Sequence, residues 1–268
     1  MSAKNSFNKE ISFQTKKSRA TVEFIKIIND LWYDDTIELL LFRNQLIDKT
    51  VTEILHILKS AGKFVEKNIS IYDVLDIARA IRSSSIPPAR IDIGKLAYEC
   101  MRQKNACNDK NEFIKNRLKD ADKTGSFKPK DVVLYGFGRI GRLLARELML
   151  EIGSGKQLRL RAIVTRGELN ETNLEKRASL LRDDSVHDDF PGTVGIDVEN
   201  SALLINGISI HMISSNAPDT IDYTKYGIKD ALVIDNTGVW RDRDGLGLHL
   251  KSKGVSKVLL TAPAKDDI

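Results

Sequence analysis

The sequence predicts an α/β protein in which a doubly wound sheet of mostly parallel strands follows an all-helical extension. Short apolar runs alternate with helical patterns after residue 131, whereas helical periodicity alone fills residues 19–120. The polar segment 120–130, which contains Gly and Pro, separates the two patterns. We therefore expect two domains, a helical extension with its linker over residues 1–130 and a second domain over residues 131–268.

The extension shows apolar residues at three- and four-residue steps, which is typical of helices that bury one face. Ser70-Ile-Tyr-Asp73 is an Asp-for-Glu variant of a capping box and predicts a helix start. The segment 83–88, S-S-S-I-P-P, interrupts the periodicity. Further helices are expected in this region. One begins near Val22, one covers residues 37–46, one starts behind Thr50, and one covers residues 95–101.

The second domain is expected to alternate strands with helices, which favours a parallel sheet with its ligand at the carboxyl ends of the strands. Asn206-Gly207 predicts a tight hairpin turn. The expected strands cover residues 131–135, 158–164, 194–198, 202–205, 208–213, 231–234 and 257–260, and the expected helices cover residues 143–149, 174–181 and 246–251.

The composition, with 41% hydrophobic and 29% charged residues, has the values of a globular protein. No apolar run is long enough to span a membrane, and the basic start lacks the apolar core of a secretory signal. We therefore expect a cytoplasmic protein that does not contact membranes. In that compartment Cys100 and Cys107 are expected to be reduced thiols, and no histidine near them suggests a metal site.

The positive charge of the chain lies in its first half. Residues 1–130 hold 24 Lys and Arg and 17 Asp and Glu, a net charge of +7. Such an excess suits a nucleic acid or an acidic partner. Because acids are interleaved with the bases and no aromatic pattern accompanies them, we interpret the charge as a solvated helical surface and do not expect nucleic acid.

The segment 131–142, D-V-V-L-Y-G-F-G-R-I-G-R, carries the most specific signal in the chain. A strand, a glycine turn and a helix start form the device that holds the pyrophosphate of a dinucleotide in Rossmann-like domains. Gly136 permits the turn, Gly138 lets the backbone approach the phosphates, and Gly141 lets the helix pack closely. The backbone N–H groups near Arg139 and Ile140 are expected to bind the anion. The alternative is an ordinary strand-to-helix turn.

These residues resemble the opening of glyceraldehyde-3-phosphate dehydrogenase, and further segments resemble that family in the same order. They are D-S-V-H-D-D-F-P-G-T-V after residue 183, L-L-I-N-G from Leu203, D-N-T-G-V-W from Asp235, and K-V-L-L-T-A-P-A-K-D-D from Lys257. The resemblance covers residues 131–268 almost continuously. The region before it resembles the helical extension of a long bacterial subgroup of the family.

The resemblance implies the oxidation of glyceraldehyde 3-phosphate with phosphate and NAD or NADP, in glycolysis or gluconeogenesis, by a homo-oligomer acting on a small-molecule substrate. In the family, the nucleophilic cysteine lies in an S-C-T-T-N motif beyond A-P-x-K-D-D. The chain stops at Ile268, before that point. We therefore expect a truncated dehydrogenase, without the substrate domain, whose chain alone carries no catalytic residue and is inactive.

Two other interpretations stay open. The chain is alternatively a non-catalytic nucleotide-binding or interaction module derived from the same fold. A different oxidoreductase, such as an aldose or semialdehyde dehydrogenase, is the third possibility, and the S-x-H and N-T-G-x-W segments disfavour it.

The second strand ends in Thr165-Arg166, where NAD-specific sites usually place an acid on the ribose hydroxyls. Without that carboxylate a 2′-phosphate is not repelled, and a guanidinium pairs with it in bidentate fashion. We therefore predict that NADP is accepted alongside NAD. The alternative is that Arg166 is a surface arginine beside a glycine turn.

By resemblance, Asn216 meets the adenine, Thr237 and Gly238 line the cofactor groove, and Thr261 lies near the nicotinamide. Each is alternatively a strand-end residue in a turn. His187, in the D-S-x-H segment, is expected to be structural. The acidic residues of segment 183–189 lack calcium-loop spacing, so we interpret them as a solvated loop and predict no metal site.

Overall fold

The computed structural model describes residues 3–61, 65, 68–103, 107–119 and 128–266. The chain divides into two compact units, Met1–Phe127 and Lys128–Ile268, which we call unit 1 and unit 2. Most of the expected linker, residues 120–127, lies outside the described residues. No helix in the described ranges is long and apolar enough to cross a membrane.

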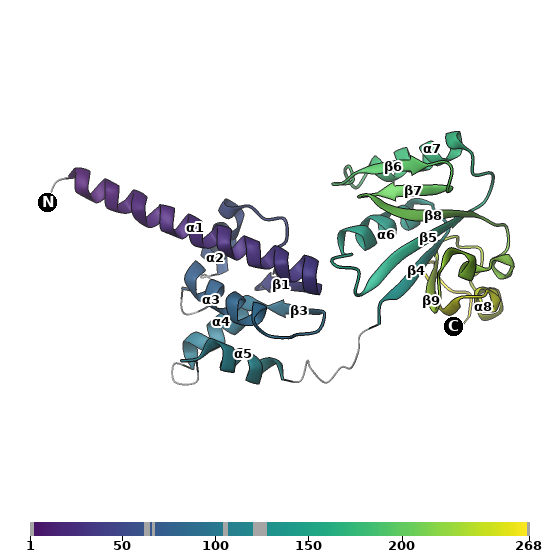
Figure 1. Ribbon diagram of the computed structural model, residues 1–268. Helices are drawn as coiled ribbons and strands as arrows, with labels where there is room; N and C mark the ends of the chain where they lie inside the picture. Colours follow the sequence, from purple (N-terminus) through teal and green to yellow (C-terminus); the bar gives the residue numbers. More distant parts are fainter. Residues whose placement is uncertain (1–2, 62–64, 66–67, 104–106, 120–127, 267–268) are drawn as a thin grey trace. The chain divides into compact units, whose positions relative to one another are not determined.

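Unit 1 is mainly helical (Figure 1), as the periodicity predicts. The capping box before residue 71 is confirmed, because Ser70 N donates to Asp73 Oδ2 at 2.8 Å and Asp73 N donates to Ser70 Oγ at 3.3 Å. Thr50 and Glu53 make the same reciprocal pair. The elements of unit 1 are α1 (Ala3–Asp35), β1 (Ile37–Leu41), β2 (Asn44–Gln45), α2 (Val51–Ala61), α3 (Ile71–Arg82), β3 (Ala89–Asp92), α4 (Ile93–Arg102) and α5 (Lys110–Leu118).

The extension is not all-helical, which corrects one expectation. The segment 37–46, expected as a helix, forms strands β1 and β2. Strand β1 pairs in parallel with β3 and antiparallel with β2. Four of the five β1 residues are buried, so the strand has no exposed face. Without alternating buried and exposed positions, the sequence does not distinguish a strand from a helix here. Phe42 and Arg43 then turn the chain with φ of 48° and 71°.

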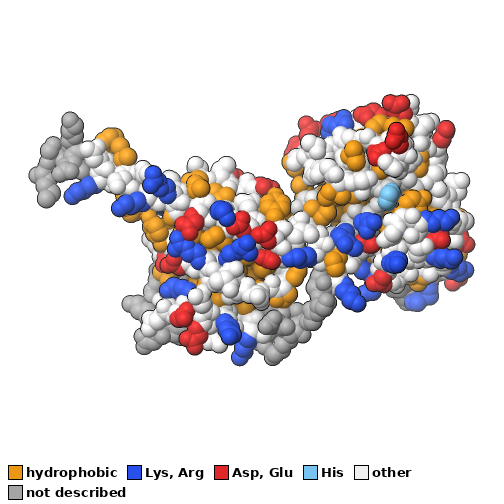
Figure 2. All heavy atoms as spheres, viewed as in Figure 1, with side chains coloured by type: hydrophobic (Ala, Val, Ile, Leu, Met, Phe, Trp, Pro, Cys, Tyr) orange, Lys and Arg blue, Asp and Glu red, His pale blue; other side chains and the backbone are white. Residues whose placement is uncertain are grey.

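Helix α1 also begins far earlier than its periodicity predicts, at Ala3 instead of near Val22. Phe7, Ile11 and Phe13 of its first half are exposed. That half therefore has no buried face to produce a pattern. On the side of unit 1 seen in Figure 2, Lys and Arg side chains lie among Asp and Glu side chains, as the interleaved sequence suggests.

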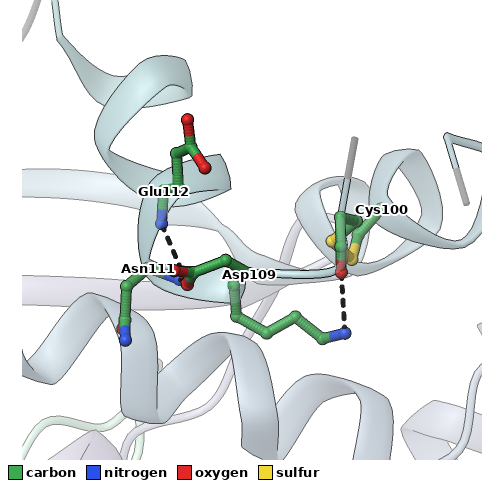
Figure 3. Close-up of a disulfide and its surroundings, with 6 residues drawn as sticks. Cys100, Asp109, Asn111 and Glu112 are labelled. Carbon is green, nitrogen blue, oxygen red and sulfur yellow. Dashed lines mark hydrogen bonds between the residues drawn. A yellow bond between two sulfur atoms is a disulfide. The ribbon is translucent and has the colours of Figure 1, made fainter. Parts of the chain in front are cut away.

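Cys100 and Cys107 form a disulfide (Figure 3), whereas reduced thiols were expected. Cys100 lies near the end of α4 and Cys107 lies just before α5, and both are buried. Their Cα atoms are 5.3 Å apart, within the range that a disulfide requires. Asp109 caps α5 by accepting from the amides of Asn111 and Glu112. The expectation failed because composition does not show that α4 and α5 meet here.

Unit 2 contains a seven-stranded sheet with the order β10-β9-β4-β5-β8-β7-β6. The five strands from β10 to β8 are parallel, and β7 and β6 complete the sheet antiparallel. Its elements are β4 (Lys130–Tyr135), α6 (Arg139–Leu150), β5 (Leu158–Thr165), α7 (Glu171–Arg182), β6 (Val194–Asp197), β7 (Ala202–Ile205), β8 (Ile208–Ser214), η2 (Pro218–Thr220), η3 (Tyr223–Tyr226), β9 (Ala231–Asp235), α8 (Arg243–Lys251) and β10 (Val255–Leu260).

The sheet is doubly wound, as predicted. Val132 and Leu134 of β4 pack into a core with α6 and α7 on one face, whereas Val133 and Tyr135 pack on the other face with Tyr223 of η3. The Asn206-Gly207 turn is also confirmed, with φ of 50° and 78°. The chain leaves β4 toward β5 and β8, then returns to place β9 on the other side of β4. Ligands bind at such a reversal point.

Candidate cofactor site

A cavity of about 400 Å³ lies at the carboxyl ends of the parallel strands of unit 2. Its volume falls within the range of small-molecule pockets. Every central strand contributes a loop to it, because parallel strands all end at this edge of the sheet. The lining residues are Tyr135, Gly136, Phe137 and Gly138 after β4, Val164, Thr165 and Arg166 at β5, Arg177 of α7, Ser215 and Asn216 after β8, and Asn236, Thr237, Val239 and Trp240 after β9.

The first and third glycines of the motif allow close backbone packing. Gly136 has φ of +98°, and a Cβ there would lie 2.9 Å from Thr237 Cγ2. The Gly136 amide donates to Val164 O at 2.9 Å, which ties the turn to β5. A Cβ on Gly141 would lie 2.3 Å from Gly136 O, so α6 rests directly on the turn. This geometry supports the interpretation given to both glycines.

The second glycine differs, because a Cβ on Gly138 would meet nothing within 4 Å. Gly138 is the N-cap of α6, and no side chain caps this helix. The first helical hydrogen bond runs from Arg142 N to Gly138 O at 3.0 Å, so the amides of Arg139 and Ile140 have no partner within the helix. Open space and uncapped amides are what a phosphate needs.

The end of β9 is held by a buried network. Asp235 Oδ1 accepts from both the amide and the hydroxyl of Thr237 at 2.7 Å. Its Oδ2 contacts His249 Nε2 of α8 at 2.9 Å, and both side chains are at most 1% exposed. The sequence alone does not indicate this pair. The pair was missed because its members are 14 residues apart and meet only through the fold.

Asn236 joins three parts of the site. Its Nδ2 donates to Gly136 O at 3.4 Å and to Ile234 O at 3.1 Å, and its Oδ1 accepts from the hydroxyl of Thr261 at 3.1 Å. Thr261 is thereby tied to the cavity edge without lining the cavity. Gly238 adopts φ of +67° directly after the lining residue Thr237.

The cavity wall at the end of β5 carries two arginines and no acidic residue. Thr165 is buried and its Oγ1 has no hydrogen-bond partner among the described residues, whereas Arg166 is exposed. Arg177, which the sequence interpretation missed, reaches the same wall from α7 and donates from Nη2 to Arg166 O at 3.2 Å. Burial lowers the pKa of Arg177. The available signal was its position beside Leu174 and Ala178, which bury one side of α7.

His187 belongs to a folded loop beside α6. Asp184 accepts hydrogen bonds from the amides of Val186 and His187 and contacts His187 Nδ1 at 3.1 Å. The Val186 amide first, and then His187, lower the pKa of Asp184 to about 2. The buried Arg146 donates to the carbonyls of the same segment, including Asp188 O at 2.7 Å. These contacts favour the structural role expected for His187.

The structure thus brings six of the eleven predicted cofactor residues into one cavity. These are Gly136, Gly138, Thr165, Arg166, Asn216 and Thr237. Of the other five, Arg139 and Gly238 directly follow lining residues, and Ile140 lies two residues after Gly138. Gly141 packs against Gly136 O, and Thr261 donates to Asn236. Within the described ranges, no three His, Cys, Asp or Glu side chains converge as a metal site would require.

Residues 130–243 match the family profile described as glyceraldehyde 3-phosphate dehydrogenase, NAD binding domain. A glyceraldehyde-3-phosphate dehydrogenase-like protein of Pseudomonas aeruginosa is 43% identical over 246 residues, which cover 90% of this chain and 53% of the relative. The glyceraldehyde-3-phosphate dehydrogenase of Zymomonas mobilis is 35% identical over 51% of this chain and 37% of the relative. A chloroplastic form from Chlamydomonas reinhardtii is 39% identical over 50% of the chain and 33% of the relative.

The Pseudomonas similarity extends into unit 1, because it covers more residues than unit 2 contains. The chain spans about half the length of that relative. The profile match falls on the strands and the glycine turn that form the cavity. The chain is therefore a protein of the glyceraldehyde-3-phosphate dehydrogenase type, and residues 130–243 carry that family's NAD-binding domain.

Proposed function

We propose that this chain binds NAD or NADP along the carboxyl edge of the unit 2 sheet and serves as the cofactor-binding part of a phosphorylating glyceraldehyde-3-phosphate dehydrogenase. The glycine turn is the observation that carries the proposal. Gly136 and Gly141 bring α6 against the turn, while the space above Gly138 stays open before an uncapped helix start. These features fit a pyrophosphate.

In the whole protein, the proposed reaction converts the aldehyde, phosphate and NAD(P) to an acyl phosphate and NAD(P)H, in glycolysis or gluconeogenesis. The bound cofactor supplies the hydride acceptor. The eleven predicted cofactor residues would hold it, and Asp235 would fix Thr237 through two hydrogen bonds. A cytoplasmic location, a homo-oligomer and a small-molecule substrate belong to the same proposal.

We propose that residues 1–268 contribute no catalytic residue. Unit 2 contains no cysteine, and the two cysteines of unit 1 are joined to each other. A thiolate, not a disulfide, is the nucleophile in cysteine chemistry. The same observation favours the alternative function, a non-catalytic nucleotide-binding or interaction module.

Isothermal titration of the 268-residue polypeptide with NAD and with NADP tests the proposal. We expect binding of at least one of them, with no steady reduction of either when glyceraldehyde 3-phosphate and phosphate are added. Absence of binding to both overturns the cofactor role. Steady turnover by the pure polypeptide overturns the proposal that residues 1–268 contribute no catalytic residue. Adding a separately produced polypeptide with the remaining half of the Pseudomonas relative distinguishes the enzyme from the binding module, because only the enzyme gains turnover.

A further inference from the structure

We propose that Arg177 binds the 2′-phosphate of NADP and makes this chain prefer NADP over NAD. The inference rests on the proposed cofactor role of unit 2. It assigns a second guanidinium, from a different element, to the position where Arg166 alone was expected. It also predicts that the chain prefers NADP, whereas the sequence predicts only that NADP is accepted alongside NAD.

The guanidinium of Arg177 lacks an anionic partner among the residues that the structure describes. Its Nε is buried without a hydrogen-bond partner, and no carboxylate among the described residues lies within 4.0 Å of its nitrogens. Within the described residues, Arg177 makes one hydrogen bond, and its acceptor is the carbonyl oxygen of Arg166. Arg177 is half-buried, so its guanidinium has lost part of its water without gaining a counter-charge. An arriving anion offsets that cost.

Two acids that lie close to Arg177 or Arg166 in the sequence have other partners. Glu175, two residues before Arg177, pairs with Arg182 at 3.7 Å. Glu168, in the loop before α7, accepts from Asn170 at 3.2 Å. An internal ion pair therefore does not explain why a cation occupies this wall.

The position of Arg177 selects the ribose phosphate over the pyrophosphate. Arg177 lines the cavity beside Thr165 and Arg166, at the end of the second parallel strand. This strand end is where dinucleotide-binding sheets meet the adenosine ribose. The pyrophosphate belongs to the glycine turn after the first strand, β4. The buried Thr165 Oγ1, which has no hydrogen-bond partner within the described ranges, adds a donor at the same strand end.

Two adenosine nucleotides that differ in the 2′-phosphate test the assignment without catalysis. We would titrate the full chain and its Arg177→Gln variant with 2′,5′-ADP and with 5′-AMP. The variant is expected to bind 2′,5′-ADP roughly ten- to hundredfold more weakly, the range for hydrogen bonds to charged groups, and to bind 5′-AMP unchanged. An equal loss for both probes would assign Arg177 to the adenine or the 5′-phosphate and overturn the inference. Unchanged affinity for 2′,5′-ADP overturns it as well.

Lys176→Gln is the matched control, because it removes the same charge from the exposed neighbour of Arg177 on α7. A loss of 2′,5′-ADP affinity equal to that of Arg177→Gln would indicate long-range electrostatics and refute a specific contact. Should Arg177→Gln fail to fold, the unmodified chain still tests the NADP preference itself. It must bind 2′,5′-ADP at least tenfold more tightly than 5′-AMP, and equal affinities refute the inference. Failure of the chain to bind NAD and NADP refutes the proposed function instead.

Discussion

Asp235 at the end of β9 and His249 in α8 meet in the interior of unit 2, with 2.9 Å between Asp235 Oδ2 and His249 Nε2. The other carboxylate oxygen holds the amide and hydroxyl of Thr237, which lines the cofactor cavity. Helix α8 is thereby connected to the site through one buried carboxylate. The position of Thr237 at the cavity therefore depends on Asp235, which does not itself line the cavity.

Replacing His249 tests that connection. His249→Leu should lower the free energy of unfolding of unit 2 by about 1.5–3 kcal/mol, because a buried carboxylate loses a hydrogen-bond partner. It should also weaken dinucleotide binding by releasing Thr237. Urea denaturation and calorimetry measure the two effects. His56→Leu, on an exposed position of α2, is the control and should stay within about 0.5 kcal/mol. Equal effects of the two variants would exclude a special role for His249.

Gly138→Val should abolish dinucleotide binding and leave unit 2 folded. The Gly138 φ of −72° suits any residue, and its Cβ would point into open space, so the fold tolerates the side chain. The same side chain would occupy the space that the pyrophosphate needs. Calorimetric titration with NADP and circular dichroism check both parts. Normal affinity in the folded variant would reduce the motif to an ordinary turn.

Gly141→Ala is the contrasting variant. Its Cβ would lie 2.3 Å from Gly136 O, a backbone atom that cannot rotate away. We expect a loss of unfolding free energy of about 1–3 kcal/mol, the usual cost of overpacking. Urea denaturation measures it. A variant as stable as the parent would show that α6 is free to shift from the turn.

The predictable parts of this protein are those whose pattern is local. The glycine turn, the capping box at Ser70 and the Asn206-Gly207 hairpin each depend on residues a few positions apart. The structure contains all three of these local features. Strand β1 was missed because a short run buried on both faces has no period. The Cys100–Cys107 disulfide, the Asp235–His249 pair and the position of Arg177 depend on which elements meet. That information appears only when the chain is folded.

Arg166→Ala should weaken NADP binding more than NAD binding, because NADP alone carries the 2′-phosphate. Arg166 is exposed, so water and salt screen its charge, and the expected loss is about 1 kcal/mol or less. The loss should therefore be smaller than that of Arg177→Gln and should shrink further in high salt. Titration with both nucleotides at low and high salt measures these differences. Equal losses for the two nucleotides would leave Arg166 as a surface arginine.

The Asp184 carboxylate should make the stability of unit 2 depend on acid pH. Hydrogen bonds from Val186 N and His187 lower its pKa from 3.8 to about 2 in the folded chain. The folded state therefore binds this proton less readily than the unfolded state, so the stabilisation is complete above pH 3.8 and is lost as the pH falls toward 2. Asp184→Asn should flatten the dependence of the urea midpoint on pH across that window. Asp183→Asn, on the exposed neighbour, removes the same charge without these hydrogen bonds and should leave the slope unchanged. A pH slope that persists in Asp184→Asn would place the acid sensitivity of unit 2 at another carboxylate.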